Sequence, residues 1–335
     1  FASSHGTARP SYILKSKRPY QIDAFELVHE TNFSYPQPWH IPGKGFLFLH
    51  TRYEGGRCLC WQRSADGVTW SERSRLASVD EGHYQVSWPC NGKVGTAFNY
   101  HPKAFAGDAK RHGLNWRTNL YYVETPDMGA SWRTVSGAPV ALPLTTPHNP
   151  ALVIDYESQG LLAYMKDLNY DPNGNPIILH VTARSWEPGP AHGPRAWRIA
   201  RWTGAEWRLH AITTSDSNYD MGSLYVEAKG VWRVIAPTET GPQPYNPGGE
   251  IAVWVSDDRG QSWSKIRQLT RESPFNHTYV RRPLNAQPGF YALWADGHAR
   301  RPSESRLYFA DKQGARVRRL PYEMDEAYAV PDTID

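Results

Sequence analysis

The chain has 335 residues, a formal net charge of +4, and an aromatic content that includes 14 Trp and 19 Tyr. This charge is modest for the length and the basic residues are scattered, which argues against a nucleic-acid-binding surface. No apolar run of about 18 residues occurs, so the sequence predicts no membrane-spanning helix. The 27 Gly and 27 Pro disfavour long helices, and the composition as a whole favours an all-β fold.

Three segments share one short pattern, a hydroxyl residue followed by Asp, Gly, Thr or Ser, and Trp. They are residues 64–70, 125–132 and 256–263. In such a segment the Asp can accept backbone N–H groups, the Gly supplies a positive φ, and the Trp packs beneath the turn. The Asp residues are 61 and 131 positions apart, which is close to one and two periods of one unit. The sequence therefore predicts a β-propeller of four-stranded antiparallel blades, with each motif at the hairpin between the third and fourth strands.

In chain order, residues 11–19 and 25–28 predict the last two strands of a partial blade, and five blades follow. The expected bounds are 1–30 for the partial blade, 31–77, 78–139, 140–214, 215–271 and 272–325 for the others, and 326–335 for a tail. The motif is eroded to Thr203–Trp207 in the third blade and to Asp311–Gly314 in the fifth. Either the stretch after Tyr322 completes the partial blade, or the chain is a piece of a longer propeller; the tail-like composition of residues 331–335 favours the second.

Ionisable and aromatic residues recur where first strands are expected to begin and second strands to end. In a propeller these positions converge on one funnel, where binding and catalysis are commonly found. The candidate binding residues are Tyr35, Arg52, His83, Tyr100, His101, Asn149, Lys166, Asp167, Asp220 and His298. The candidate catalytic residues are His148, His277, Tyr279, Arg281, Glu239 and Asp296. The alternatives for these residues are core packing, hydrogen bonds to loop carbonyls, and ion pairs between blades.

The Asp motifs resemble the Asp-boxes of sialidases, and longer segments resemble the BNR-4 branch of that superfamily. The segments that carry the second resemblance are residues 34–38, 148–152 and 276–283. The resemblance implies a seven-bladed propeller, of which about five and a half blades are visible, and an activity like that of ulvan lyases or of enzymes that cleave rhamnosyl-glucuronate linkages. In those enzymes a funnel His is the central catalytic group, with Tyr and Arg assisting. The sequence lacks the Arg-Ile-Pro motif of a true sialidase, which disfavours that activity.

The favoured function is a polysaccharide lyase that cleaves a uronic-acid-containing glycan by β-elimination. A base removes the proton next to the uronate carboxylate while cations neutralise that carboxylate. By position and resemblance, His148 is the expected base, Tyr279 the proton donor, and Arg281 or Arg52 with His277 the neutralising groups.

Two other functions stay open at this point. A glycoside hydrolase would use two carboxylates from the set Asp167, Asp220, Glu239 and Asp296. A non-catalytic propeller would bind a glycan or a protein with the same funnel.

The expected partner is an anionic poly- or oligosaccharide, and the expected location is secreted, extracellular or periplasmic. The resemblance allows an axial Ca²⁺ or Zn²⁺, although no ligand spacing in the sequence indicates one. Cys58 and Cys60 are expected on one face of a strand. Pairing of either with Cys90 and buried free thiols are both open.

Overall fold

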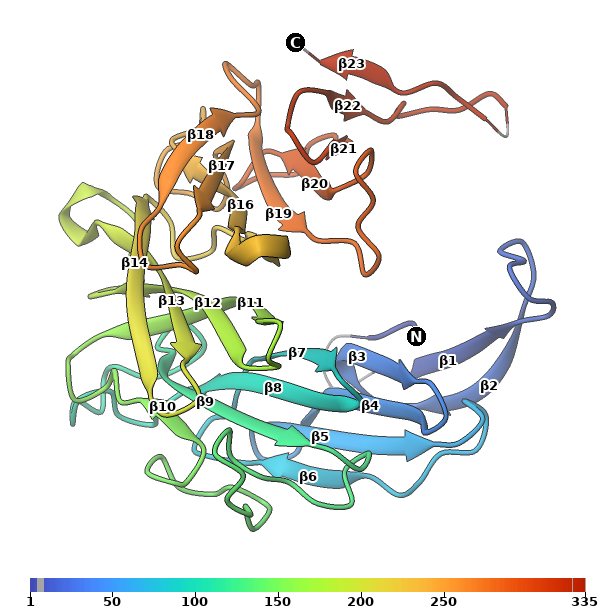
Figure 1. Cartoon of the computed structure of the whole chain (residues 1–335), viewed down its shortest axis with the longest axis vertical. Helices are drawn as coiled ribbons and strands as arrows, with labels where there is room; N and C mark the ends of the chain where they lie inside the picture. The colour runs from blue at the N-terminus through green and yellow to red at the C-terminus, as the bar shows by residue number, and fades with distance from the viewer. Residues whose placement is uncertain (5–8, 327, 335) are drawn as a thin grey trace. The chain divides into compact units, whose positions relative to one another are not determined.

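The computed structural model describes residues 1–4, 9–326 and 328–334 (Figure 1). Regular structure in these residues is β apart from two short 3-10 helices, Pro190–His192 and Ala228–Gly230. Accordingly, no helix in the described part of the chain is long and apolar enough to cross a membrane. The chain divides into two compact units, Phe1–Gly160 and Leu161–Asp335, and each is described separately below as unit 1 and unit 2.

Unit 1 begins with a two-stranded sheet, where the sequence predicts a partial blade. Its strands are β1 (Ser11–Ser16) and β2 (Phe25–Thr31). A four-stranded antiparallel sheet follows, with its strands in chain order (Figure 1): β3 (Ser34–Ile41), β4 (Gly45–Tyr53), β5 (Arg57–Ser64) and β6 (Ser74–Ala77).

The second sheet of unit 1 extends further along the chain than the sequence predicts. Its strands are β7 (Gln85–Cys90), β8 (Lys93–Tyr100), β9 (Thr118–Thr125) and β10 (Leu152–Ile154). The expected boundary between the second and third blades, at residues 139 and 140, is not observed, because β10 pairs with β9 as the outer strand of this second sheet. A long, Pro-rich connection separates β9 from its three-residue partner, and the short β10 carries too little pattern to be assigned from sequence.

Unit 2 contains three further antiparallel sheets, again with strands in chain order. The first has β11 (Leu162–Tyr170), β12 (Pro176–Ala183), β13 (Arg195–Trp202) and β14 (Trp207–Ser215). The second has β15 (Ser223–Val226), β16 (Trp232–Glu239), β17 (Glu250–Ser256) and β18 (Ser264–Gln268). The third has β19 (Asn276–Arg281), β20 (Ala292–Gly297), β21 (Leu307–Ala310), β22 (Val317–Arg319) and β23 (Asp332–Ile334).

The last of these sheets has a fifth strand that the sequence does not predict. Residues 326–335 are expected to be a tail, but β23 pairs with β22 from Asp332 to Ile334. Arg319 donates to the carboxylate of Asp332 at 2.9 Å across this pair. Residues 327 and 335 of the expected tail lie outside the described residues.

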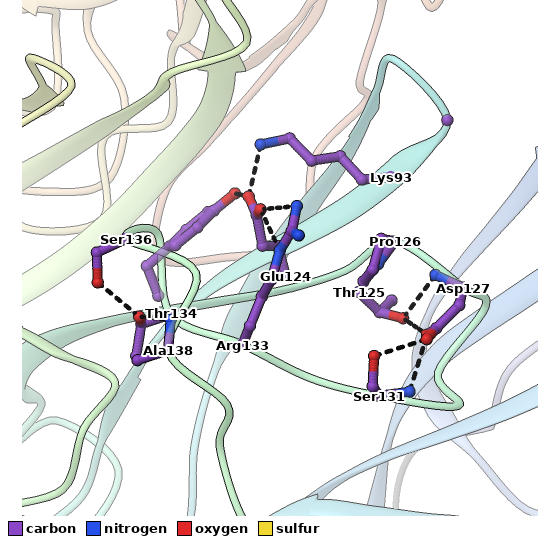
Figure 2. A network of polar contacts seen from close by, with 12 residues as sticks. Lys93, Glu124, Thr125, Pro126, Asp127, Ser131, Arg133, Thr134, Ser136 and Ala138 are labelled. Carbon is purple, nitrogen blue, oxygen red and sulfur yellow. Dashed lines mark hydrogen bonds and ion pairs between the residues drawn. The ribbon is translucent and has the colours of Figure 1, made fainter.

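The Asp motifs form the predicted hairpins between third and fourth strands, and their carboxylates are occupied by local hydrogen bonds. One oxygen of Asp66 accepts the N–H groups of Val68 and Thr69, both at 2.8 Å. In the second motif Asp127 accepts from the N–H and the hydroxyl of Ser131 (Figure 2). The hydrogen bonds from Thr69 and Val68 lower the pKa of Asp66 to about 2. The prediction that the motif carboxylates are structural is confirmed.

Glycine in these motifs is required by the close approach of an aromatic ring. Gly129 has a φ of +87°, and a Cβ atom there would lie 2.7 Å from the Trp61 ring of β5. Close by, the buried Glu124 accepts from Lys93 at 2.6 Å and from Arg133 at 2.9 Å (Figure 2). The charged side chains Glu124, Lys93 and Arg133 at the hairpin end of this sheet are therefore paired with one another and serve the fold.

Each sheet has a second end, which we call its loop rim. It is the end where the first strand begins, the second ends and the third begins, for example at Ser34, Tyr53 and Arg57 in the first sheet. At or near the loop rim, β3, β11 and β19 each contain one extra residue relative to the neighbouring strand. Such β-bulges re-aim a side chain, and they concentrate near functional sites. The loop rim is therefore the part of each sheet that favours a functional site.

Candidate functional site

The loop rim of unit 1 gathers six aromatic and basic side chains from five strands and loops. We call this group the rim cluster; its members are Tyr35, Tyr53, Arg57, Tyr84, His101 and Arg117. Tyr84 lies at its centre, with its ring centroid 5.4 Å from that of Tyr35 and 5.1 Å from that of His101. The guanidinium carbons of Arg57 and Arg117 lie 4.8 Å and 4.1 Å from the Tyr84 ring centre.

The loop before β7 holds the cluster together through its backbone. Arg57 N–H donates to Glu81 O at 3.2 Å, and His101 N–H donates to Gly82 O at 2.8 Å. Gly82 has a φ of +114°, and a Cβ there would lie 2.4 Å from the Cβ of Arg57. Only glycine permits this approach, so the loop brings Arg57 from one sheet and His101 from the next to the same place.

His83 lies in the same loop and has a structural role. Its Nε2 accepts the N–H of Val79 at 2.8 Å, and its Nδ1 lies 2.8 Å from the carbonyl oxygen of Asn99. Since a carbonyl can only accept, Nδ1 carries the proton and both ring nitrogens are engaged. Burial lowers the pKa of His83 to about 4, so the ring stays neutral and closes the loop that carries Tyr84.

His101 differs from His83 because neither of its ring nitrogens has a hydrogen-bond partner among the described residues. The side chain is fully buried. Burial, together with the positive charges of Arg117 and Arg57, lowers its pKa to about 2. Buried polar atoms are paired in the great majority of cases, and an exception calls for an explanation such as a functional role.

The tyrosines of the cluster remain accessible. Tyr35 is 38% exposed and has a φ of +52° at the bulge of β3. Burial, followed by the neighbouring Tyr84 and a hydrogen bond to it, raises the pKa of Tyr35. Tyr53 accepts from Nε of Arg57 at 3.2 Å, and Nη1 of Arg57 is buried without a partner among the described residues.

The other predicted residues of unit 1 lie outside the rim cluster. Arg52 donates to Glu54 at 3.1 Å, and Glu54 also pairs with Arg73 and Arg75. Tyr100 is buried and hydrogen-bonds to Glu157. Among the polar contacts of the described residues, none joins either side chain to Tyr84.

The two predicted residues that precede β10 also lie elsewhere. His148 is an exposed side chain whose Nε2 lies 3.3 Å from Asp155. Asn149 accepts the N–H of Ala151 and donates to Thr146 O, which shapes the loop. Both residues precede the outer strand of the second sheet, so the first-strand position expected for His148 does not occur.

In unit 2, both ring nitrogens of His277 are engaged in a chain of hydrogen bonds. Nε1 of Trp294 donates to its Nδ1 at 3.0 Å, so Nε2 carries the proton and donates to Ser273 Oγ at 2.9 Å. Ser273 in turn donates to Glu250 at 2.9 Å. Because Nε2 is a donor, His277 cannot take the serine proton, and the arrangement is not an activated nucleophile. Burial lowers the pKa of His277.

The predicted carboxylates of unit 2 are also engaged. Asp296 accepts from Tyr308 OH and from Arg306 N–H, each at 2.7 Å. Glu239 pairs with Lys265 at 3.1 Å. Asp167 accepts Leu224 N–H at 2.8 Å.

Lys166, in the first strand β11, and Asp220, just before the first strand β15, are both buried. The expectation that Lys166 and Asp167 end a second strand is wrong, because both lie inside the first strand β11, at its bulge. Lys166 donates to Asn218 O at 2.6 Å. Asp220 accepts Gly248 N–H at 2.8 Å, and burial raises its pKa to about 8.

Three predicted residues remain near the surface of unit 2. His298 accepts the N–H of Arg300 in its own loop at 3.2 Å. Tyr279 and Arg281 form a stacked pair, with the guanidinium carbon 4.4 Å from the ring centre. In the described part of the chain no group of three or more His, Cys, Asp or Glu could hold a metal ion.

Comparison with known proteins assigns the chain to a family. A sequence model of the BNR repeat-containing family matches residues 1–215. The chain belongs to this family. The predicted relation to the BNR-4 branch is thereby confirmed.

Two curated proteins are similar to more than half of the chain. An ulvan lyase of Nonlabens ulvanivorans is 25% identical over 280 residues, which cover 77% of this chain and 56% of that protein. An ulvan lyase of the PL25 type from Pseudoalteromonas sp. (strain PLSV) is 25% identical over 207 residues, or 57% of this chain and 42% of that protein. The chain thus spans about half the length of these relatives.

Solved structures confirm the fold class. A polysaccharide lyase of family PL25, an ulvan lyase, superposes with a TM-score of 0.72 at 18% identity over 89% of this chain and 69% of that chain. A Hadza microbial sialidase superposes with a TM-score of 0.52 at 13% identity over 86% of this chain and 58% of that chain. With the four-stranded antiparallel sheets, these likenesses confirm the predicted β-propeller class.

Proposed function

We propose that this protein is a polysaccharide lyase that cleaves a uronic-acid-containing glycan by β-elimination at the rim cluster. The observation that carries the proposal is the environment of Tyr84. Two guanidinium groups, an unpaired neutral imidazole and an exposed second tyrosine all lie against its ring. The relatives named above are ulvan lyases, and one is solved with a bound chain of glucuronate and sulfated rhamnose.

The reaction requires three kinds of group. Cations must offset the carboxylate, since the proton on the adjacent carbon becomes acidic only when the enolate charge is stabilised. A base must take that proton, and an acid must protonate the leaving oxygen. The rim cluster supplies arginines for the first task and phenols for the other two.

We assign the groups as follows. Arg57 and Arg117 bind the uronate carboxylate, because planar guanidinium groups match its geometry. Tyr84, whose ring lies against the same two cations and next to Tyr35, acts as the base and takes the C5 proton in its phenolate form. The electron pair forms the C4–C5 double bond as the C4–O bond breaks. Tyr35, which its raised pKa keeps protonated, donates a proton to the leaving oxygen.

His101 is a positioning residue in this proposal. It is fully buried behind Tyr84, and its low pKa keeps it neutral. It supports the ring without adding a further charge to the site.

The rival hydrolase is less well supported. Hydrolysis needs two carboxyl groups placed on either side of the scissile bond. The candidates Asp167, Asp220, Glu239 and Asp296 are each held by the partners described above.

The proposed substrate has a consequence for location. A polysaccharide of this kind is too large to enter a cell intact, so we propose that the protein acts outside the cell or in the periplasm. Secretion of the full protein into the culture medium or periplasm would be measured by fractionation.

The test of the proposal is a glycan panel with product analysis. Ulvan and other uronate glycans are incubated with the protein, and ultraviolet absorbance of the new double bond is followed. Mass spectrometry separates the mechanisms, because hydrolysis adds one water to the product and elimination does not. Products that all carry the added water, or no cleavage of any uronate glycan, would contradict the lyase assignment.

The sharpest variant is Tyr84→Phe, which removes one oxygen and keeps the ring against the two arginines. We expect the rate of cleavage to fall by about 10²- to 10⁴-fold, the usual contribution of a general acid or base. Tyr245→Phe, a partly exposed tyrosine of unit 2, is the matched control. Equal activity of Tyr84→Phe and the parent protein would remove Tyr84 from the mechanism.

A further inference from the structure

Tyr279 is exposed although its backbone conformation is one that tyrosine rarely adopts. Its φ is +62°, and it occupies the bulge of β19, where the pairing with β20 shifts between Thr278 and Arg281. Its side chain is 55% exposed. Strained residues persist where the surrounding structure fixes them, and they cluster at ligand sites.

The bulge is anchored from both sides by unit 2. Val280 is fully buried, and its N–H donates to Met221 O at 3.1 Å. Ser223 Oγ donates to Val280 O at 3.1 Å, and Arg282 N–H donates to Ser223 Oγ at 3.1 Å. The backbone on either side of the bulge is therefore held against the strand β15 and the loop before it, and Tyr279 is presented on a fixed support.

The two arginines that follow have different environments. Arg282 lies 3.7 Å from Asp167 and donates to Leu168 O, so its charge is matched inside the unit. Arg281 is stacked on the Tyr279 ring at 4.4 Å, and its Nη1 lies 3.5 Å from Lys166 O. Within the described residues no carboxylate lies at ion-pair distance from Arg281. The Arg281 cation thus lies against the exposed Tyr279 ring and has no acidic partner among the described residues.

The same backbone device occurs in unit 1. Tyr35 also has a positive φ, also occupies the bulge of a first strand at the loop rim, and is also exposed. Tyr35 belongs to the rim cluster, whereas Tyr279 has no role in the mechanism above.

We propose that Tyr279 and Arg281 form a binding subsite of unit 2 for an anionic sugar residue. The sugar's C–H face packs on the Tyr279 ring, and Arg281 binds the carboxylate or sulfate group of the same residue. The ligand class rests on the proposed function, since the polysaccharide considered there is anionic. The subsite holds the chain and takes no part in proton transfer.

The test measures glycan binding directly, so that it does not depend on cleavage. Affinity electrophoresis of the full protein is run in gels that contain ulvan, polygalacturonate or neutral laminarin. Tyr279→Gly removes the ring and suits the positive φ, so folding should be preserved. Arg281→Gln removes the charge. We expect each variant to bind ulvan about five- to tenfold more weakly, the scale of one aromatic or cation–aromatic contact.

Tyr322→Gly is the matched control, because Tyr322 is equally exposed, at 54%, and also lies under an arginine, Arg306. Arg306 differs in having an acidic partner, Glu304, at 2.9 Å, and Tyr322 is not at a bulge. This variant should bind as the parent protein does.

The polyanions separate the two ligand groups. Weaker binding of both ulvan and polygalacturonate by Arg281→Gln indicates the carboxylate, and weaker binding of ulvan alone indicates the sulfate. Unchanged binding of ulvan by Tyr279→Gly would overturn the inference even if Tyr84→Phe abolishes cleavage. Conversely, weaker binding in a protein that cleaves nothing would support the subsite and reject the lyase.

Discussion

Two buried histidines at the loop rims, His101 in unit 1 and His277 in unit 2, have opposite environments. His277 uses both ring nitrogens, with Trp294 as donor and Ser273 as acceptor. His101 uses neither nitrogen within the described structure. In sequence, both histidines satisfy one rule, which is a histidine where a first strand is expected to begin or a second strand to end. Only the hydrogen-bond partners of the ring nitrogens distinguish His277, which completes the fold, from His101, which belongs to the proposed site.

Acid should destabilise unit 1 more than unit 2. The pKa values of His50, His83 and His101 in unit 1 are lowered to about 3, 4 and 2, mainly by burial. Their folded values lie below the unfolded value of about 6.5, so the unfolded chain binds more protons as the pH falls. Each can therefore remove up to about 1.4 kcal/mol of stability per pH unit below about pH 6.5, until the folded pKa is reached.

Unit 2 should lose less stability over the same range. Burial lowers the pKa of His180 to about 4 and also lowers the pKa values of His210 and His277, all with the same sign of effect. It raises that of Asp220 to about 8, so the folded state binds the extra proton and this contribution to stability grows as the pH falls through 8. We expect hydrogen exchange, followed by mass spectrometry from pH 7 to 5, to accelerate first in peptides of unit 1. Earlier opening of unit 2 would contradict the comparison.

The variant His277→Leu should destabilise the protein substantially. It leaves the indole N–H of Trp294 buried without its acceptor, and such an orphaned group costs about 1–3 kcal/mol. Urea unfolding of the full chain would measure the loss. Trp294→Phe in the same background removes the orphaned donor and should recover part of the stability, which isolates the hydrogen bond from the change in packing.

The variant His101→Leu should have a much smaller effect on stability. No hydrogen bond of the described structure is lost, and an apolar side chain in a buried place can be neutral or stabilising, so we expect a change within about 1 kcal/mol. Cleavage of ulvan should nevertheless slow, because Tyr84 loses the ring behind it. His101→Phe, which restores a ring, should retain more activity than His101→Leu. A loss of stability as large as that of His277→Leu would show that His101 has a partner of its own.

Much of the fold could be predicted from sequence because its signals are local. The Asp-motif hairpins depend on residues within five positions of each other, and Asp66, Asp127 and Asp258 all accept the expected bonds. The boundary of the third sheet could not be predicted. β10 is three residues long and pairs with β9 across a long connection, so the segment around His148 was assigned to the wrong sheet.

The proposed site contains two residues that the sequence predicts, Tyr35 and His101, because connectivity places them at strand ends. It also contains Arg57 and Arg117, which lie where third strands begin, whereas the sequence predicts only residues at first and second strands. The sequence signal for the loop that joins Arg57 and His101 is Gly82, a glycine whose neighbours Glu81 and His83 are charged or polar. The hydrogen bonds that occupy His83 and His277 join residues many positions apart or depend on side-chain direction, and no spacing rule reveals them.

The three thiols make the protein convenient for spectroscopy. None of the three is in a disulfide among the described residues, Cys58 and Cys60 are buried, and burial raises the pKa of Cys60 to about 12. Cys90 alone is partly accessible, at the end of β7 away from the loop rim. Because alkylation requires an accessible thiolate, a maleimide dye should attach at Cys90 without mutagenesis. A reporter there would follow unfolding of unit 1 while leaving the tyrosines and arginines untouched.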